Sequence, residues 1–396
     1  MKRRDFIKHG TLASSLCLVP SFVKAFESVT NMAMGHKKLV IIQLAGGNDG
    51  LNTIIPYTND IYYKNRPQIA IPKQQLIKVT DDLGFHNKLL PLKKIYDKGF
   101  LAVINNVGYP NPNRSHFRST DIWQTASDHN EYLSTGWLGR YLDLYAKHSY
   151  GGVEIDDSLS FILKGEKLNG IATKNPAILY NNTRTPYFEK ILASQTDTHL
   201  SEHNLGYLYK TMIAAKSSAK YIYETSKTYN THQEYPNNPF GNQLKTTAEF
   251  INSGLESKVY YISMGGFDTH AGQLNKQSRL LDVFSSGIEV FIKDLEQGNT
   301  FKDTLILTFS EFGRRLKQNA AIGTDHGAAN NVFVIGKHLN KPGFYNEDPD
   351  LLHLDTNGDL QYSVDFRSVY ATILDRWLEV NDRSILNKSF SRLEFI

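Results

Sequence analysis

The stretch "KLVIIQLAGGNDG", at residues 38–50, decides the fold. Its first seven residues are mostly apolar and do not alternate with polar ones, which is typical of a strand buried on both faces of a parallel sheet. The two glycines that follow let the backbone turn sharply, so the strand is expected to end there.

Apolar runs of the same kind recur along the chain and alternate with segments of helical spacing. The further strands are "FLAVINNVG" (100–108), "SKVYYISMGG" (257–266), "DTLILTFSEFG" (303–313) and "NNVFVIG" (330–336); the clearest helices lie at 87–99, 278–298 and 363–380. Strands that alternate with helices predict an α/β protein. We expect a doubly wound, mainly parallel sheet with helices on both faces.

The length of 396 residues and the composition, with 40% hydrophobic and 21% charged residues, suit a protein with a substantial core. We expect a single domain over residues 38–390. Residues 150–255 are different, because they mix short alternating stretches with an Asn- and Pro-rich loop. We interpret this middle part as an insertion or cap over the sheet edge.

Polar clusters follow the ends of the predicted strands. They are "GGNDG" (46–50), "SHF" (115–117), "GGFDTH" (265–270) and "SEFGRR" (310–315). In open sheets of this type, ligands bind beyond the carboxyl ends of the strands. We therefore expect the four clusters to meet at one edge, although they are far apart in sequence.

Several of these residues have side chains that can bind a divalent cation. Asp268 and His270 point to the same side if "GGFDTH" is extended, so both can reach one ion. Asp49 offers carboxylate oxygens, and His326 in "GTDHG" (323–327) is a candidate ligand. Asp325 either orients His326 or a neighbour or is itself a metal ligand. The alternative for each is an ordinary polar turn. Glu311 is either a further ligand or a general base.

Other residues suit catalysis on an anionic group. Ser115 is a candidate nucleophile at the start of a helix, where the helix N-terminus favours an anion. His116 and Arg118 lie beside it, and Arg314 can hold an oxyanion in a bidentate fork. The alternatives are a serine that only caps the helix, a buried histidine and solvated arginines.

The first 25 residues are typical of an export signal. Arg3 and Arg4, followed by a short apolar stretch and a small residue at Ala25, resemble the bacterial twin-arginine consensus, and an ordinary secretory signal is the alternative. We therefore expect a twin-arginine (Tat) signal peptide over 1–25, the twin-arginine translocase as a partner, and a periplasmic or extracellular location. No later stretch approaches a membrane span.

The signal also accounts for the net charge and the single cysteine. Residues 1–25 hold five basic residues and one acidic residue, a net charge of +4, and the whole chain is also +4, so the remainder balances at zero. This balance argues against nucleic-acid binding through a broad positive field. Cys17 lies in the same segment, so any metal must be held by His, Asp, Glu or Asn.

Taken together, the motifs resemble the domain-of-unknown-function family 1501 (DUF1501), a branch of the alkaline phosphatase-like and sulfatase superfamily. The motifs are "LAGGNDGLNTIIPY", "RSHFRSTDIW", "GWLGRYL", "GGFDTHAGQ", "FSEFGRRLKQN", "GTDHGAANNVFVIG" and "VDFRSVYATILDRWL". The resemblance implies an alkaline phosphatase-like fold that carries two metal ions, usually zinc, and a Ser or Thr nucleophile for phosphate or sulfate esters.

Carried over by motif, the resemblance implies that Asp49, Asp268, His270, Glu311 and His326 correspond to metal ligands and Ser115 to the nucleophile. The chain departs from the pattern at Glu311-Phe312, where the superfamily has Asp-His. Zinc, magnesium, calcium or no metal at all therefore stay open.

Two functions are consistent with these residues. The first is an exported, metal-dependent hydrolase of small anionic phosphate or sulfate esters. The second is a non-catalytic ligand-binding or envelope-assembly protein that keeps the fold with a degenerate metal site. Asp268, His270 and His326 favour the first function, and Phe312 favours the second.

Overall fold

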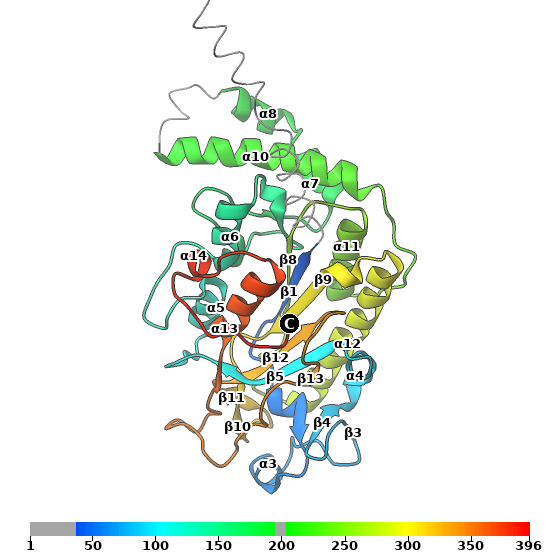
Figure 1. Ribbon diagram of the computed structural model, residues 1–396, viewed down its shortest axis with the longest axis vertical. Coiled ribbons are helices and arrows are strands. Elements are labelled where there is room, and N and C mark those ends of the chain that lie inside the picture. Colours follow the sequence, from blue (N-terminus) through cyan, green and yellow to red (C-terminus); the bar gives the residue numbers. More distant parts are fainter. Residues whose placement is uncertain (1–36, 195–202) are drawn as a thin grey trace, which may run out of the picture. The chain divides into compact units, whose positions relative to one another are not determined.

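A nine-stranded sheet runs through the computed structural model, which describes residues 37–194 and 203–396 (Figure 1). The strand order is β13-β5-β12-β9-β1-β8-β6-β7, and β14 also pairs with β5. The expected export signal lies outside the described residues. Within the described ranges, no helix combines the length and apolar character needed to cross a membrane.

The centre of the sheet is parallel, as expected. Strand β1 (Lys38–Leu44) pairs in parallel with β8 (Val259–Met264) on one side and with β9 (Thr304–Phe309) on the other. Strand β12 (Asn330–Ile335) is the exception, because it is antiparallel to both β9 and β5 (Leu101–Gly108). The start of β12 therefore lies at the edge where its neighbours end.

The remaining elements are shorter or lie outside this centre. The other strands of the main sheet are β6 (Gly152–Glu154), β7 (Ile171–Ala172), β13 (Gly343–Phe344) and β14 (Val364–Asp365). Two small sheets consist of β2 (Ile54–Pro56), β4 (Leu83–His86) and β3 (Leu76–Lys78), and of the hairpin β10 (Arg314–Gln318) and β11 (Thr324–His326). The smaller helices include α3 (Asp60–Asn65), α14 (Arg383–Leu386) and the 3-10 turn η1 (Gly50–Asn52).

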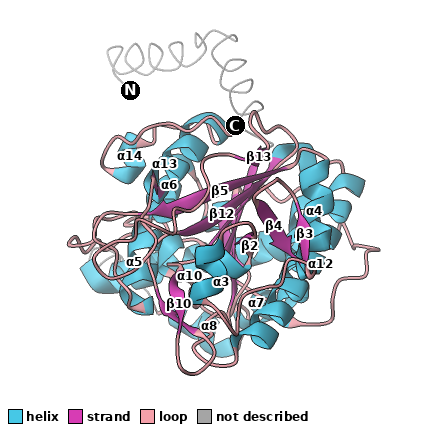
Figure 2. Ribbon diagram, turned by 90° about the horizontal axis from the view of Figure 1, so that it is seen from below, coloured by secondary structure: helices cyan, strands magenta, loops and turns pink. Residues whose placement is uncertain are grey.

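Helices cover both faces of the sheet. On one side lie α5 (His116–Thr125), α6 (Trp137–Tyr145) and α13 (Phe366–Thr372); on the other lie α4 (Leu90–Asp97), α11 (Pro239–Asn252) and α12 (Gln273–Gln297) (Figures 1 and 2). Alternate residues of β1 enter the two cores: Leu39 packs in the first and Val40 in the second. This double burial explains why "KLVIIQL" is almost continuously apolar.

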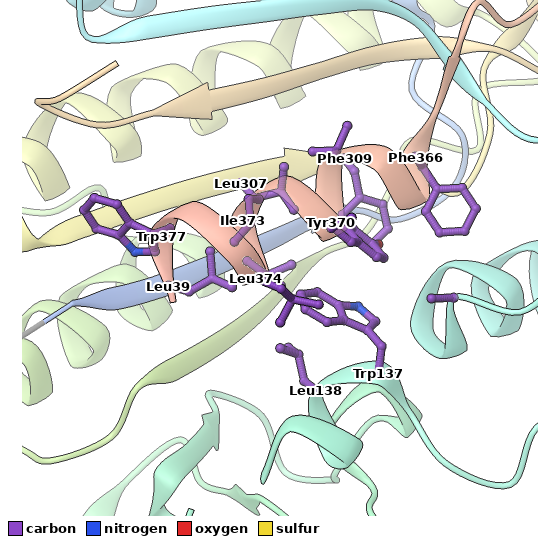
Figure 3. Close-up of a cluster of buried hydrophobic side chains, with 14 of the residues drawn as sticks. Leu39, Trp137, Leu138, Leu307, Phe309, Phe366, Tyr370, Ile373, Leu374 and Trp377 are labelled. Carbon is purple, nitrogen blue, oxygen red and sulfur yellow. The ribbon is translucent and has the colours of Figure 1, made fainter. Parts of the chain in front are cut away.

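The C-terminal helix packs against the first core (Figure 3). Helix α13 continues into a π-helical turn, Ile373–Trp377, and Tyr370 stacks on the fully buried Trp137 of α6 with ring centroids 4.4 Å apart. The indole nitrogen of Trp377 donates to the carbonyl of Lys38 at 2.9 Å. The π-helical turn after α13 is thereby tied to the first strand of the sheet.

The middle of the chain, residues 150–255, contributes to the sheet as well as to its surroundings. Strands β6 and β7 extend the main sheet beyond β8. Helices α7 (Pro176–Asn182), α8 (Pro186–Ala193) and α10 (His203–Ser226) pack on one another, and Tyr221 of α10 contacts the backbone of Glu256, just before β8. These three helices therefore lie toward the amino end of β8, at the end of the molecule opposite the hairpin β10–β11 (Figure 1).

Candidate metal centre

Side chains from three separate segments meet beyond the carboxyl ends of the parallel strands. His116 is the first residue of α5, which follows β5; Asp268 and His270 come from the loop after β8. His326 ends β11, directly before the antiparallel β12. The predicted shared site therefore exists, and the direction of β12 brings its last member to the same edge.

One carboxylate oxygen, Oδ1 of Asp268, is the hub of this cluster. The Nε2 atom of each of three imidazole rings lies near it, at 3.4 Å for His116, 3.1 Å for His270 and 3.2 Å for His326. The Nε2 atoms of His270 and His326 are 2.8 Å apart. Three rings thus turn the same nitrogen toward one oxygen.

The other ring nitrogen of each histidine faces an acceptor outside the cluster. Nδ1 of His116 lies 2.9 Å from Oε1 of Glu311, and Nδ1 of His326 lies 2.7 Å from the carbonyl of Arg114. Nδ1 of His270 lies 3.5 Å from Oδ1 of Asp325. Such an acceptor holds the proton on Nδ1, which leaves the Nε2 lone pair free to bind a metal ion.

The residues present fit a divalent ion. A tetrahedral zinc ion with bonds of about 2 Å places its ligand atoms about 3.3 Å apart, close to the separations around Asp268. Ligand atoms of His116, Asp268 and His326 lie within 4.8 Å of one another. In addition, Nε2 of His116 is buried without a hydrogen-bond partner. Nitrogen donors favour zinc over magnesium or calcium, which prefer oxygen.

The charges around the hub shift the pKa of several groups. Burial alone would raise the pKa of Asp268, but hydrogen bonds from Arg314 and His326 outweigh it and lower the pKa to about 2. The hydrogen bond to Glu311 raises the pKa of His116, whereas burial lowers the pKa of His326. Asp268 is therefore an anion at neutral pH, as a metal ligand must be.

Phe312 packs against the imidazole rings. Its side chain is almost fully buried, and its ring centroid is 4.9 Å from that of His116 and 4.6 Å from that of His326. Phe312 thus supports the rings of two of the histidines.

Two predicted ligands lie around the cluster, in contact with its histidines. Glu311 accepts hydrogen bonds from His116 and from the backbone nitrogen of Gly46, so both contacts use its Oε1. Asp325 faces His270 and accepts a hydrogen bond from Asn319, which is the largest cause of its lowered pKa. Glu311 and Asp325 therefore orient histidines. For Asp325 this role was expected, toward His326 or a neighbouring residue.

The structure does not bring Asp49 into the cluster. Its carboxylate is fully buried, caps η1 through the backbone nitrogen of Leu51, and pairs with the equally buried Arg66 at 2.6 Å. Gln273 also donates to it. Since these partners occupy its oxygens, the expectation that Asp49 is a metal ligand does not fit the geometry.

The two predicted catalytic arginines are also engaged. Arg118 pairs with Asp121, donates to the carbonyls of residues 128, 129 and 131, and lies over the ring of Tyr132. Arg314 does reach the cluster, where it donates to Oδ1 of Asp268 at 2.7 Å, but its side chain is fully buried. Neither guanidinium is placed as the expected fork for an oxyanion.

Ser115 occupies the N-cap position of α5, directly before His116. Its residue is exposed, and its side chain makes no capping hydrogen bond. The neighbouring Ser119 is buried and bonded to the carbonyl of Glu311, which removes it as an alternative nucleophile. The hydroxyl of Ser115 is therefore accessible to solvent.

A cleft of about 490 Å³ opens beside the cluster. His116, Asp268 and Glu311 line it together with neutral side chains that include Gln43, Thr120 and Tyr261. The amide of Gln43 donates to Glu311 at 3.3 Å and connects this wall to the cluster. Among the described residues that line the cleft there is no lysine or arginine.

Sequence reasoning assigned His116 to catalysis and did not identify it as a ligand. The sequence did contain a sign of this role, because His116 follows a predicted strand and its loop, as Asp268 does. The contribution of Gln43 was also missed, because a glutamine inside a buried strand carries no local sign of facing a site.

A known protein family matches more than half of the chain. The family model described as "Protein of unknown function (DUF1501)" matches residues 102–387, so the chain belongs to this family. The resemblance drawn from the motifs is thereby confirmed. A search of the curated proteins found no match.

Among solved structures, the chain is similar to the lipoteichoic acid synthase LtaP from Listeria monocytogenes, with 8% identity, coverage of 92% of this chain and 75% of that chain, and a TM-score of 0.41. It is also similar to the PsFucS1 sulfatase from Pseudoalteromonas sp., with 12% identity, coverage of 93% and 72%, and a TM-score of 0.38. A protein in the alkaline phosphatase superfamily from Vibrio parahaemolyticus has 10% identity, coverage of 91% and 72%, and a TM-score of 0.37. Likenesses at this level identify no activity.

Proposed function

We propose that the protein is a metal-dependent hydrolase of phosphate or sulfate esters. The observation that carries the proposal is the orientation of three imidazoles, which turn Nε2 toward Asp268 and Nδ1 toward outside acceptors. Side chains in a solvated polar turn have no reason to share this orientation, whereas metal ligands require it. His116, Asp268 and His326 would hold the ion, with His270 beside them and zinc as the best match.

The residues have separate roles in such a reaction. His116, Asp268 and His326 would hold a zinc ion, which would supply polarisation of an ester oxygen. Ser115 offers an exposed hydroxyl at the N-terminus of α5, where the backbone N–H groups favour an anionic group. Glu311 keeps His116 oriented, and the cleft beside them admits the substrate.

Export belongs to the same proposal. The twin-arginine pair at the start of the sequence suits a protein that folds and takes up metal before it crosses the membrane. The translocase is the partner that the signal implies, and the expected location is the bacterial periplasm or the exterior. Fusion of residues 1–36 to a folded reporter, with Arg3→Lys and Arg4→Lys as the control, tests this part.

The function is tested by elemental analysis of purified protein together with assays on aryl phosphate and aryl sulfate esters. We expect bound zinc and turnover that a chelator abolishes and added zinc restores. Ser115→Ala should remove the turnover and keep the metal. The control is Ser194→Ala, which changes an exposed serine outside the cluster and should alter neither the turnover nor the metal content. Protein that binds no metal and shows no metal-stimulated turnover would refute the proposal.

The second candidate is a non-catalytic binding protein, and one observation favours it. Phe312 stands where the resembled superfamily has a histidine, so a bound ion would lack a ligand of the catalytic pattern and would serve only the structure. In that case the protein binds zinc tightly and hydrolyses neither ester, and Ser115→Ala has no effect.

A further inference from the structure

The side chain of Arg314 occupies an unusual position next to the candidate metal centre. It is fully buried and donates to the carbonyls of Gly46, Gly47, Phe267 and Thr324 as well as to Asp268. Four carbonyl oxygens and one carboxylate oxygen thus surround the guanidinium, and oxygens of these kinds are also the ligands that a hard divalent cation takes. Here a guanidinium fills it.

The carboxylates that could bind a second ion have other partners. Both oxygens of Asp49 contact Arg66, at 2.6 and 3.1 Å. Both oxygens of Glu311 are engaged too, because Oε1 accepts from His116 and Gly46, and Oε2 accepts from Gln43. A second ion would lie about 3.5–4 Å from the first. The guanidinium of Arg314 already binds the hub oxygen, at 2.7 Å, on the side where a second ion would have to share it.

The backbone around Arg314 has a conformation in which its carbonyls face the guanidinium. Gly46 and Gly47 have positive φ angles of 118° and 73°, and these two residues turn two of the four carbonyls toward the guanidinium. A Cβ on Gly47 would lie 2.3 Å from the ring of Phe312 and 3.3 Å from Nε of Arg314. Glycine is therefore required at residue 47 for the arginine to fit.

We infer that the site holds a single metal ion and that Arg314 is a built-in cation in place of a second one. The inference rests on the proposed metal-dependent function, since it concerns the same site. The ion bound by His116, Asp268 and His326 then shares the hub oxygen with a fixed positive charge. The arrangement supplies positive charge on both sides of Asp268 while using one exchangeable ion.

The test counts the ions on the folded full-length protein by native mass spectrometry after saturation with zinc and desalting. One zinc ion per chain is the expected result. Two ions would overturn the inference and leave the proposed function standing. No bound ion would overturn both, so the two failures are distinguishable.

A variant tests the role of the charge. In Arg314→Gln, removal of a positive charge beside the ligand oxygen should strengthen zinc binding by about tenfold or more, measured by competition with a chelator. If Arg314 only positions the loop, Arg314→Gln should instead weaken zinc binding, because the ligands of the loop would lose their positions. Weaker or unchanged zinc affinity would therefore overturn the role of Arg314 as a fixed cation.

Arg66→Gln is the matched control. Arg66 is equally buried and also donates to backbone carbonyls and to a carboxylate, but its partners are Leu316, Arg315 and Asp49 rather than the cluster. This variant should lose stability and still bind one zinc ion with the wild-type affinity. If Arg314→Gln does not fold, the ion count of the wild-type protein still decides between one ion and two.

Discussion

At the scale of single residues, Glu154 at the end of β6 is a buried acid outside the metal centre. Its carboxylate accepts hydrogen bonds from the backbone nitrogen and hydroxyl of Ser160, and burial raises its pKa from 4.5 to about 7. Since the pKa is higher in the folded protein, the folded state binds more protons between pH 4.5 and 7. The free energy of unfolding therefore falls as pH rises through this window.

Glu154→Gln removes this titration. We expect a flatter dependence of stability on pH between 4.5 and 7, with a change of at most about 3 kcal/mol relative to wild type across the window. Urea unfolding at a series of pH values measures it. Glu256→Gln, which changes an exposed acid in the same part of the chain, is the control. An unchanged slope in Glu154→Gln would contradict the assignment.

At the scale of elements, the loops after β1 and β8 approach each other closely at Gly46. A Cβ on Gly46 would lie 2.4 Å from the backbone nitrogen of Asp268, which is too close for any real contact. The loop that carries the hub carboxylate can therefore reach the first strand only because residue 46 is a glycine.

Gly46→Ala should displace the loop of Asp268 and weaken zinc binding by at least about tenfold, as loss of ligand support does. Gly254→Ala is the matched control, because Gly254 also has a positive φ, 79°, but a Cβ there meets nothing within 4 Å. The control should lose only about 1 kcal/mol of stability from backbone strain and keep its zinc affinity. Equal zinc affinity in the two variants would refute the steric explanation.

Packing between α6 and α13 gives a second prediction at this scale. Trp137 is fully buried against Tyr370, whereas Leu144 on the same helix is 54% exposed. We expect Trp137→Ala to lower the free energy of unfolding by about 3–5 kcal/mol because of the cavity it leaves. Leu144→Ala should change it by less than about 0.5 kcal/mol. Chemical denaturation of both variants checks the contrast.

At the scale of the whole molecule, the metal centre joins segments that are distant in the chain. His116 and His326 are 210 positions apart, and an ion bound to both stabilises only the folded state. At a zinc concentration of one hundred times Kd, the expected gain is about 2.7 kcal/mol. Differential scanning calorimetry should show a rise in Tm of a few degrees with zinc and its reversal by a chelator.

His326→Ala provides the comparison for this measurement. The variant lacks one ligand, so its Tm should respond much less to zinc than that of the wild-type protein. A zinc-dependent rise of the same size in His326→Ala would mean that the ion binds elsewhere.

The sequence by itself determined most of the fold. The runs at 38–44, 100–108, 257–266, 303–313 and 330–336 all contain strands of the main sheet, because a strand buried on both faces must be apolar throughout. It also determined that polar residues after these strands would converge, since parallel strands end at one edge. Asp268 and His270 were found in this way.

The tertiary structure decided which of these residues can be ligands. Asp49 and Asp268 occupy similar places after β1 and β8, but Arg66 pairs with the first and three imidazoles surround the second. The antiparallel direction of β12 was also needed to bring His326 to the edge. Strand direction and ion pairing depend on partners far away in the chain, and local sequence carries no record of them. The sequence therefore located the site, and long-range contacts determined its chemistry.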